Sequence, residues 1–431
     1  VGPSASLWEN LQENLHDPLT QLFMQLILII LLARICGRVA AGLGQPAVVG
    51  EMVAGILLGP SLLGWVWPDF FHFIFPASSL GSLRLFSQIG VCLFMFVVGM
   101  ELNLTQLKQQ AKTAMAVSQA SILVPYLLGV ITAFFLYTRF AQNGTSFVAF
   151  ALFIGVSMSI TAFPVLARIL EERQMTHSPL GVTALICAAM NDVTAWCILA
   201  GVVAVAKAKS LGSAGLNVVL LILFVGLLWC LVKPRLTGWL AKTEVRPEQP
   251  GKGTMAAVLA VVFISALATD VMGVHALFGA FLAGLIMPAR PALREFLGVR
   301  LEHFSSVFLL PLFFAFTGLR LQIGLLQDGG DVAIALGLVL IATVGKLGGT
   351  MLTARLTGMR WLDAFGLGAL MNTRGLVELI ALNIGYDLKI LSPRIFAMLV
   401  LMALITTAMT GPMLTWCESL RRRQAMKLKP A

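Results

Sequence analysis

The chain has 431 residues, of which 58% are hydrophobic and only 12% are charged, and its formal net charge is +10. A soluble protein of this length needs far more polar surface, so the composition excludes an ordinary globular enzyme and predicts an all-α polytopic membrane protein. In such a protein the positive charge reflects how the loops are placed about the lipid bilayer, and it does not indicate a nucleic-acid partner. The six cysteines show no paired spacing, which favours packing roles over disulfides or a metal site.

Apolar runs long enough to cross a bilayer recur along the whole sequence. We predict a transmembrane region, 19–418, that follows an extracytoplasmic segment, 1–18, and precedes a basic cytoplasmic tail, 419–431. Residues 233–254 are predicted to be a linker between two halves of the region. We predict thirteen spans: 19–40, 46–64, 85–101, 113–137, 147–170, 179–206, 214–232, 253–270, 274–288, 303–320, 331–354, 362–383 and 393–418.

The charges near the span ends predict the orientation. With the N-terminus outside, 21 of the 30 lysines and arginines lie at the inner side and 7 at the outer side. Because cytoplasmic loops carry the excess of positive charge, this asymmetry favours an outside N-terminus and a cytoplasmic C-terminus.

The two halves carry similar interruptions at corresponding positions. Pairing spans 1–6 with spans 8–13 matches Ser-Ile-Thr-Ala-Phe-Pro-Val-Leu (159–166) with Met-Asn-Thr-Arg-Gly-Leu-Val-Glu (371–378). The offset of seven spans is odd, so the repeats are inverted. Interrupted helices at matching points of inverted repeats are the strongest sequence sign of a transport site.

Ionisable residues lie at mid-membrane depth in three of the predicted spans. Asp192 lies in the run 180–206 directly after Asn191, and Lys346 lies near the middle of a later run. Arg374 and Glu378 are one helical turn apart in a third run. Placing a charge there costs about 2.5–3.5 kcal/mol even on lenient scales, so these residues predict an ion pathway.

Asp192 is the predicted site of ion and proton binding. A carboxylate can bind a dehydrated K⁺ or Na⁺, or a proton, and competition between them couples two fluxes. The alternative is a structural pair between Asp192 and Lys346, although a buried ion pair stabilises a fold poorly. Asn191 is neutral, and its carbonyl oxygen could cap a helix or bind the ion.

The interruption near Pro164 offers further candidate ligands. Proline removes a backbone N–H and clashes with the carbonyl of Ile160, and the hydroxyls of Ser157, Ser159 and Thr161 are close in sequence. An opened helix here would present free carbonyls to a cation. A simple proline kink is the alternative.

The second interruption is predicted to be mainly structural. Asn372 is a weak helix breaker, and Arg374 with Glu378 is expected to hold the opened helix, while a direct part in transport stays open. Glu51, near the inner end of the second span, is expected to snorkel or to contact a loop.

Four stretches together resemble the cation:proton antiporter superfamily, in its monovalent cation:proton antiporter-2 branch. The stretches are Gly50-Glu51 to Gly64, Thr161-Ala-Phe-Pro164, Asn191-Asp192, and Lys346 with Asn372-Thr-Arg374-Gly375. Bacterial potassium-efflux and sodium/proton antiporters belong to this branch, and plant cation/proton exchangers are similar.

The resemblance implies inverted repeats with two crossing discontinuous helices. It implies a core domain of spans 113–206 and 331–418 that moves like an elevator against a dimerisation domain of spans 19–101 and 253–320, with 214–232 as a linking span. It also implies a homodimer in the bacterial inner membrane.

In these terms Asp192 is the ion- and proton-binding carboxylate, Lys346 is its charge partner, and Thr161 contributes to the site. Two features depart from the family pattern. Electrogenic relatives carry Asp-Asp where this chain has Asn191-Asp192, which suggests electroneutral exchange. Many potassium-efflux relatives continue into a nucleotide-binding domain, and this sequence ends shortly after the last span.

The sequence therefore predicts an antiporter that exchanges K⁺, favoured slightly over Na⁺, for H⁺ without a cofactor. A sodium-coupled organic-anion symporter on the same architecture is one alternative, since Arg374 could bind an anion. A passive cation channel is another, although its polar groups would form a continuous stripe. An enzyme finds no support, since the loops hold no catalytic triad, metal cluster or phosphate-binding loop.

Overall fold

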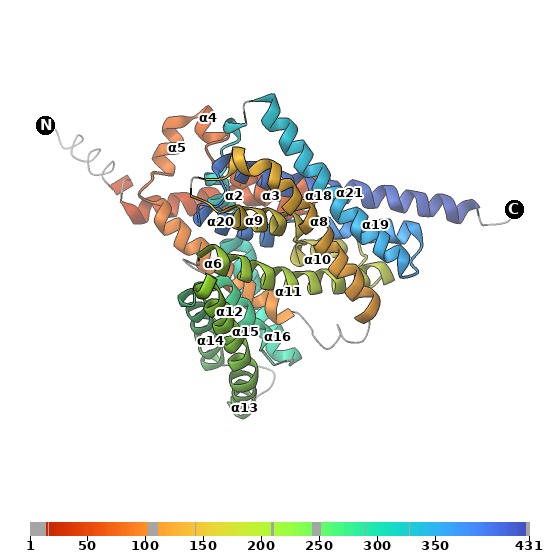
Figure 1. Ribbon diagram of the computed structural model, residues 1–431. Helices are drawn as coiled ribbons and strands as arrows, with labels where there is room; N and C mark the ends of the chain where they lie inside the picture. The colour runs from red at the N-terminus through yellow and green to blue at the C-terminus, as the bar shows by residue number, and fades with distance from the viewer. Residues whose placement is uncertain are drawn as a thin grey trace.

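The structure is a computed structural model that describes residues 14–15, 17–101, 111–142, 144–207, 211–243, 251–288, 290–326 and 328–427. These residues form an all-helical protein, joined outside its helices by short turns and one isolated β-bridge (Figure 1). The helices of its first half are α2 (Pro18–Gly42), α3 (Ala47–Leu58), α4 (Leu63–Val66), α5 (Pro68–Ile74), α6 (Leu80–Glu101), α8 (Ala111–Phe140), α9 (Phe147–Ser159), α10 (Phe163–Glu172), α11 (Pro179–Lys207), α12 (Leu211–Leu227) and η1 (Leu228–Val232). Those of its second half are α13 (Lys233–Thr243), α14 (Lys252–Val271), α15 (Ala276–Leu285), α16 (Pro291–Phe304), η2 (Ser305–Leu309), α17 (Leu310–Arg320), η3 (Ile323–Leu325), α18 (Gly329–Leu356), α19 (Trp361–Met371), α20 (Leu376–Asp387) and α21 (Pro393–Lys427).

The membrane-spanning helices nearly match the expected number. Among the described residues, eleven helices are long and apolar enough to cross a bilayer, or twelve when the bent pair α19 and α20 is one span. The predicted span 274–288 corresponds to α15, which has ten residues. A ten-residue helix is about 15 Å long, half of the hydrocarbon thickness, so the thirteenth span stays a prediction.

Two segments predicted as connections are helical. The expected linker 233–254 begins as α13, which continues α12 through the π-helical turn η1. Pro234 lies just after the π-helical turn, and proline inside a continuous helix removes one backbone hydrogen bond, so the wider turn lies where the regular pattern is interrupted. The segment between the predicted spans 274–288 and 303–320 is mostly α16, which continues through η2 into α17. The polar and basic residues in these two segments suggested loops. In the structure each segment is helical and continues an apolar helix beyond the part predicted to span the membrane.

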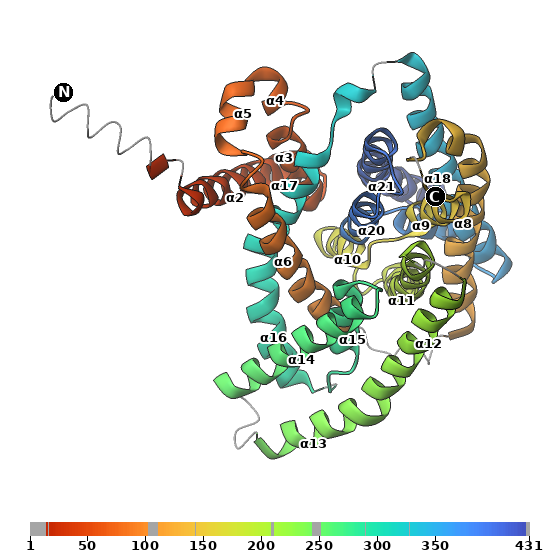
Figure 2. The same cartoon turned by 60° about the vertical axis from the view of Figure 1, so that its left-hand side comes forward.

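The helices pack in two groups. The first group comprises α8–α11 and α18–α21, whose members pack on one another. The second comprises α2, α3, α6 and α14–α17, with α15 against α6 and α17 against α3. Figure 2 shows the two groups side by side, with α10 and α20 in the first group facing α6 and α17 in the second. The broken helices thus lie where the two groups meet.

Glycines set the close packing of α3 against its neighbours. A Cβ at Gly50 would lie 2.2 Å from the carbonyl oxygen of Cys36 in α2. At Gly55 it would lie 2.2 Å from the carbonyl oxygen of Phe314 in α17, and Gly318 faces Gly55 in return. Both clashes are with backbone, which cannot rotate away, so small residues are required at this crossing.

Gly55→Ala is expected to destabilise the protein by about 1–3 kcal/mol, because α3 and α17 must move apart. Gly226→Ala in α12 is the matched control, since a Cβ there meets nothing within 4 Å. Thermal unfolding in detergent, followed by the loss of the monodisperse size-exclusion peak, measures both variants. Equal melting temperatures for the two variants would contradict the packing argument.

Candidate ion-binding site

The helix that begins as α9 is opened at its midpoint. α9 ends at Ser159, the backbone of Ile160 and Ala162 is extended, and α10 begins at Phe163. Pro164 lies in the first turn of α10, where the missing N–H of proline is harmless. The proline therefore starts a second half-helix, and the alternative of a kinked continuous helix is wrong.

The second opened helix lies against the first. α19 ends at Met371 and α20 begins at Leu376, at an angle of 44°. The backbone N–H of Ala162 donates to the carbonyl of Thr373 at 3.1 Å, and the Thr161 hydroxyl donates to the carbonyl of Met371 at 2.9 Å. Each break thus satisfies backbone groups that the other leaves free, as helices opened inside a membrane require.

Two buried cations close the C-terminal end of α9. The guanidinium of Arg374 donates to the carbonyls of Ser157 at 2.5 Å and Met158 at 2.7 Å. The ammonium of Lys346 donates to the carbonyl of Ser159. Because a helix C-terminus carries free carbonyls and partial negative charge, these cations replace the water that would otherwise solvate it.

Arg374 is also paired with Glu378. Their side chains are both fully buried, with 3.2 Å between Nη1 and Oε1. The Arg374 backbone is fixed by Thr407, whose hydroxyl accepts from its N–H at 2.9 Å and donates to its carbonyl at 2.8 Å. The expected structural role of Arg374 and Glu378 agrees with these contacts.

Asp192 lies in the middle of α11, fully buried, opposite the break in the first helix. Neither carboxylate oxygen has a hydrogen-bond partner among the described residues, and the N–H of Phe163 faces the carboxylate without full hydrogen-bond geometry. Lys346 is near enough to act on it electrostatically but donates to Ser159. Asp192 and Lys346 are therefore close but do not form a hydrogen-bonded pair. A buried carboxylate without a hydrogen-bond donor is suited to bind a cation or a proton.

Asn191 connects the first break to α8 through two hydrogen bonds. Its amide nitrogen donates to the hydroxyl of Ser121 in α8 at 2.9 Å, and its oxygen accepts from the N–H of Thr161 at 3.3 Å. It therefore holds the extended backbone of the first break against α8 and α11. Asn372 is buried beside the second break and donates weakly to the carbonyl of Thr406 at 3.5 Å.

The hydroxyls predicted as ligands are all buried close to the break. Ser157 donates to Phe153 at 2.8 Å and Ser159 donates to Val156 at 2.9 Å, both within α9. Such bonds use the hydroxyl proton and leave the oxygen lone pairs as acceptors. Sequence reasoning missed Ser121 and Thr407, whose only signal is a hydroxyl within an apolar run.

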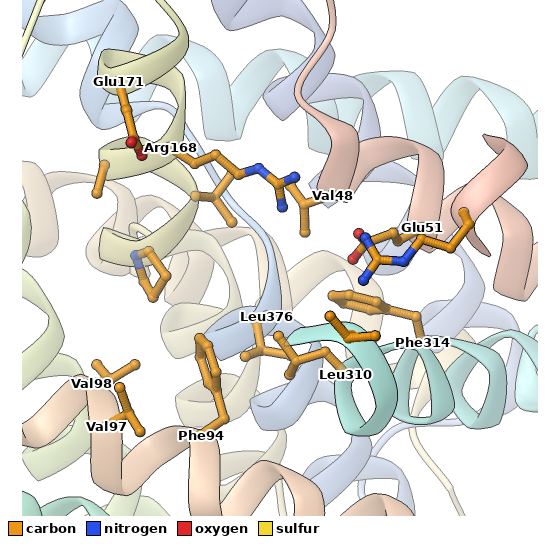
Figure 3. Close-up of a pocket in the computed structure, with 15 residues that line it drawn as sticks. Val48, Glu51, Phe94, Val97, Val98, Arg168, Glu171, Leu310, Phe314 and Leu376 are labelled. Carbon is orange, nitrogen blue, oxygen red and sulfur yellow. The ribbon is translucent and has the colours of Figure 1, made fainter. Parts of the chain in front are cut away.

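A cavity of about 450 Å³ lies between the two helix groups, beside the start of α10. Pro164 and Val165 of α10 line it, together with Arg34, Glu51 and residues of α6 and α17. Figure 3 shows the side chain of Arg168 reaching from α10 across the cavity towards α3, where Glu51 lies. Asp192 does not line the cavity, although Phe163, whose amide faces it, is the neighbour of Pro164.

The sequence suggested that Glu51 snorkels to the membrane surface or contacts a loop. Instead, its side chain is only 6% exposed and faces this cavity, so it does not snorkel. Arg34 and Arg168 provide positive charge near it. A buried carboxylate is tolerated here because opposite charges and the cavity surround it.

A buried acid without a donor, beside two opened helices that face each other, is the arrangement of a secondary membrane transporter. A model of the family described as "Sodium/hydrogen exchanger, transmembrane" matches residues 27–417. The chain therefore belongs to the sodium/hydrogen exchanger family, which confirms the resemblance to cation:proton antiporters found in the sequence.

Individual relatives agree with this assignment. The Na(+)/H(+) antiporter NhaS4 of Synechocystis is 41% identical over 88% of this chain and 93% of its own length. Cation/H(+) antiporter 20 of Arabidopsis thaliana is 40% identical and K(+)/H(+) antiporter 1 of Saccharomyces cerevisiae 35% identical, each over 86% of this chain. The chain spans less than half the length of these two, 45% and 43%.

The fold is also similar to a solved structure. The sodium proton antiporter MjNhaP1 from Methanocaldococcus jannaschii superposes with a TM-score of 0.65, over 91% of this chain and 99% of that one. Their sequences are 14% identical, so this likeness concerns the fold.

Proposed function

We propose that the protein exchanges a monovalent cation for a proton across the membrane, with Asp192 as the shared binding group. The observation that carries the proposal is a buried carboxylate without a hydrogen-bond donor, opposite an opened helix. A cation or a proton can neutralise it, but not both at once, so loading one releases the other. Thr161, Ser157, Ser159 and Asn191 supply oxygen atoms around it.

We further propose that the first helix group is a mobile core and the second a scaffold that forms a homodimer. The cavity between the groups supports this division, because a core that slides along the scaffold would close it on one side and open it on the other. Thirteen spans in inverted repeats, the N-terminus outside and the C-terminus cytoplasmic, in a bacterial inner membrane, complete this proposal. In that orientation the cavity opens to the cytoplasm.

Two alternatives are less consistent with the geometry. An organic-anion symporter would need a free cationic anchor, but the guanidinium of Arg374 is already bound to two carbonyls and a carboxylate. A passive channel would need a continuous polar path, whereas the polar groups at the site bond mainly to one another and to the two breaks.

The transported ion is proposed to be K⁺ in preference to Na⁺, exchanged one for one. Asn191 is neutral, so one carboxylate is available for one charge in each direction. Relatives at 35–41% identity are named for Na⁺/H⁺, K⁺/H⁺ and cation/H⁺ exchange, so the measurement must compare ions.

Proteoliposomes with an imposed pH gradient and a lumenal pH dye should show collapse of the gradient when K⁺ is added, and a weaker response to Na⁺ or Li⁺. The rate should not change when a membrane potential is imposed, because one-for-one exchange moves no net charge. Liposomes without protein give the baseline. A rate that follows the potential would contradict electroneutral exchange, and no response to any cation would overturn the antiport proposal itself.

A further inference from the structure

The interface between the two helix groups is open on one side of the site and closed on the other. The open side holds the cavity of about 450 Å³ around Glu51 and Arg168. On the other side a crevice of only about 30 Å³ is lined by residues that include Ser87 of α6, Arg320 of α17 and Asp387 of α20. A water-filled path therefore fits on the first side only.

The closed side is bridged by polar side chains from both groups. Asp387, at the end of α20, accepts from Arg320 at 2.8 Å and from Arg84 of α6 at 3.3 Å. Arg320 also donates to the side-chain oxygen Oδ1 of Asn383 at 2.9 Å, and the side-chain nitrogen Nδ2 of Asn383 donates to the Thr317 hydroxyl at 2.9 Å. Two arginines and a threonine of the second group thus hold one face of α20.

Arg320 is held in place by contacts with both helix groups. Its guanidinium lies 4.1 Å from the ring of Phe316, in its own helix, and 5.3 Å from the ring of Tyr386 in α20. Its side chain is 14% exposed, so the ion pair with Asp387 is largely shielded from water. Charge pairs shielded in this way bind more firmly than pairs on an open surface.

We infer that Arg84, Arg320, Asn383 and Asp387 form a gate that closes the extracytoplasmic side of the ion site while the cytoplasmic side is open. The inference rests on the proposed movement of the first group against the second. Since the arginines belong to one group and Asp387 to the other, the pairs must separate when that movement opens the outer side. These residues then determine which face of the membrane the site is exposed to.

The test is cysteine labelling in membranes, in a background that lacks the six native cysteines. Ser87→Cys reports the outer crevice and Ala167→Cys, on α10, reports the inner cavity. A membrane-impermeant maleimide is added from each side in turn. Asp387→Asn and Arg320→Gln are compared with Arg320→Lys, which keeps the charge, and with the unmodified gate.

Arg139→Gln is the matched control. It removes a salt bridge of 2.6 Å to Asp331 at the same end of the protein, but between α8 and α18, both in the first group. A loss of stability alone would therefore act equally in Arg139→Gln and in the gate variants.

Asp387→Asn and Arg320→Gln should speed labelling at position 87 on the order of fivefold and slow labelling at position 167. The labelling rates of Arg320→Lys should stay nearer those of the parent, and the rates of Arg139→Gln should equal the parent rates. Any other pattern would overturn the gate, including faster labelling at both positions or the same change in Arg139→Gln. Labelling needs no ion gradient, so it tests the gate independently of exchange. The gate proposal can be wrong while liposomes still show cation/proton exchange, and the exchange proposal can be wrong while the labelling pattern supports the gate.

Discussion

Asp192→Asn is expected to abolish cation-dependent collapse of a pH gradient in proteoliposomes, to less than about 1% of the parent rate. Asparagine has nearly the same shape but neither binds a proton at neutral pH nor carries the charge that replaces the hydration of a cation. Moving an unpaired cation into the buried site without that charge costs several kcal/mol, and each 1.36 kcal/mol slows the rate tenfold.

The variant should remain folded, because the carboxylate oxygens of Asp192 have no hydrogen-bond partner to lose. Asp270→Asn, at an exposed helix end, is the control and should exchange at the parent rate. Size-exclusion profiles of both variants show that folding is intact. Full exchange by Asp192→Asn would remove this carboxylate from the mechanism and return attention to Glu51 in the cavity.

Arg374→Gln is expected to lower the free energy of unfolding by about 3–5 kcal/mol, because it leaves the Glu378 carboxylate and two carbonyls of α9 buried without their cation. Glu378→Gln should cost much less, since Arg374 keeps its bonds to Ser157 and Met158. In the double variant the loss should be smaller than the sum, because no unpaired charge remains.

Thermal unfolding in detergent measures this double-mutant cycle. Arg355→Gln, at an exposed position near the end of α18, should change stability by no more than about 0.5 kcal/mol. If Arg374→Gln unfolds like the parent but loses exchange, Arg374 acts directly on the transported ion and the structural role is wrong.

Much of the site could be predicted from the sequence because charge inside a membrane is rare. Asp192, Lys346 and Arg374 stand out against apolar runs, and the structure brings all three to the two breaks. Both breaks were predicted because Pro164 and the polar stretch 371–378 interrupt otherwise helical runs. These signals are local and need no knowledge of packing.

What the sequence missed depends on partners distant in the chain. Lys346 was expected to be the charge partner of Asp192 and is near enough to act on it, but the sequence did not show that its ammonium also binds the Ser159 carbonyl at the opened helix end. Glu51 was assigned to the membrane edge, because nothing local shows that it faces a cavity. The outer contacts of Asp387 involve residues about 70 and 300 positions away, which no periodicity reveals.

The polar contacts described around the two breaks come entirely from the first helix group: Ser121, Asn191, Lys346, Thr406 and Thr407. None comes from the described helices of the second group. If the first group moves against the second as proposed, these contacts would travel with Asp192, and the ligands around the ion would be the same on both sides of the membrane. The proposed exchange draws on no other source of energy, so it would run in either direction, as the two ion gradients dictate.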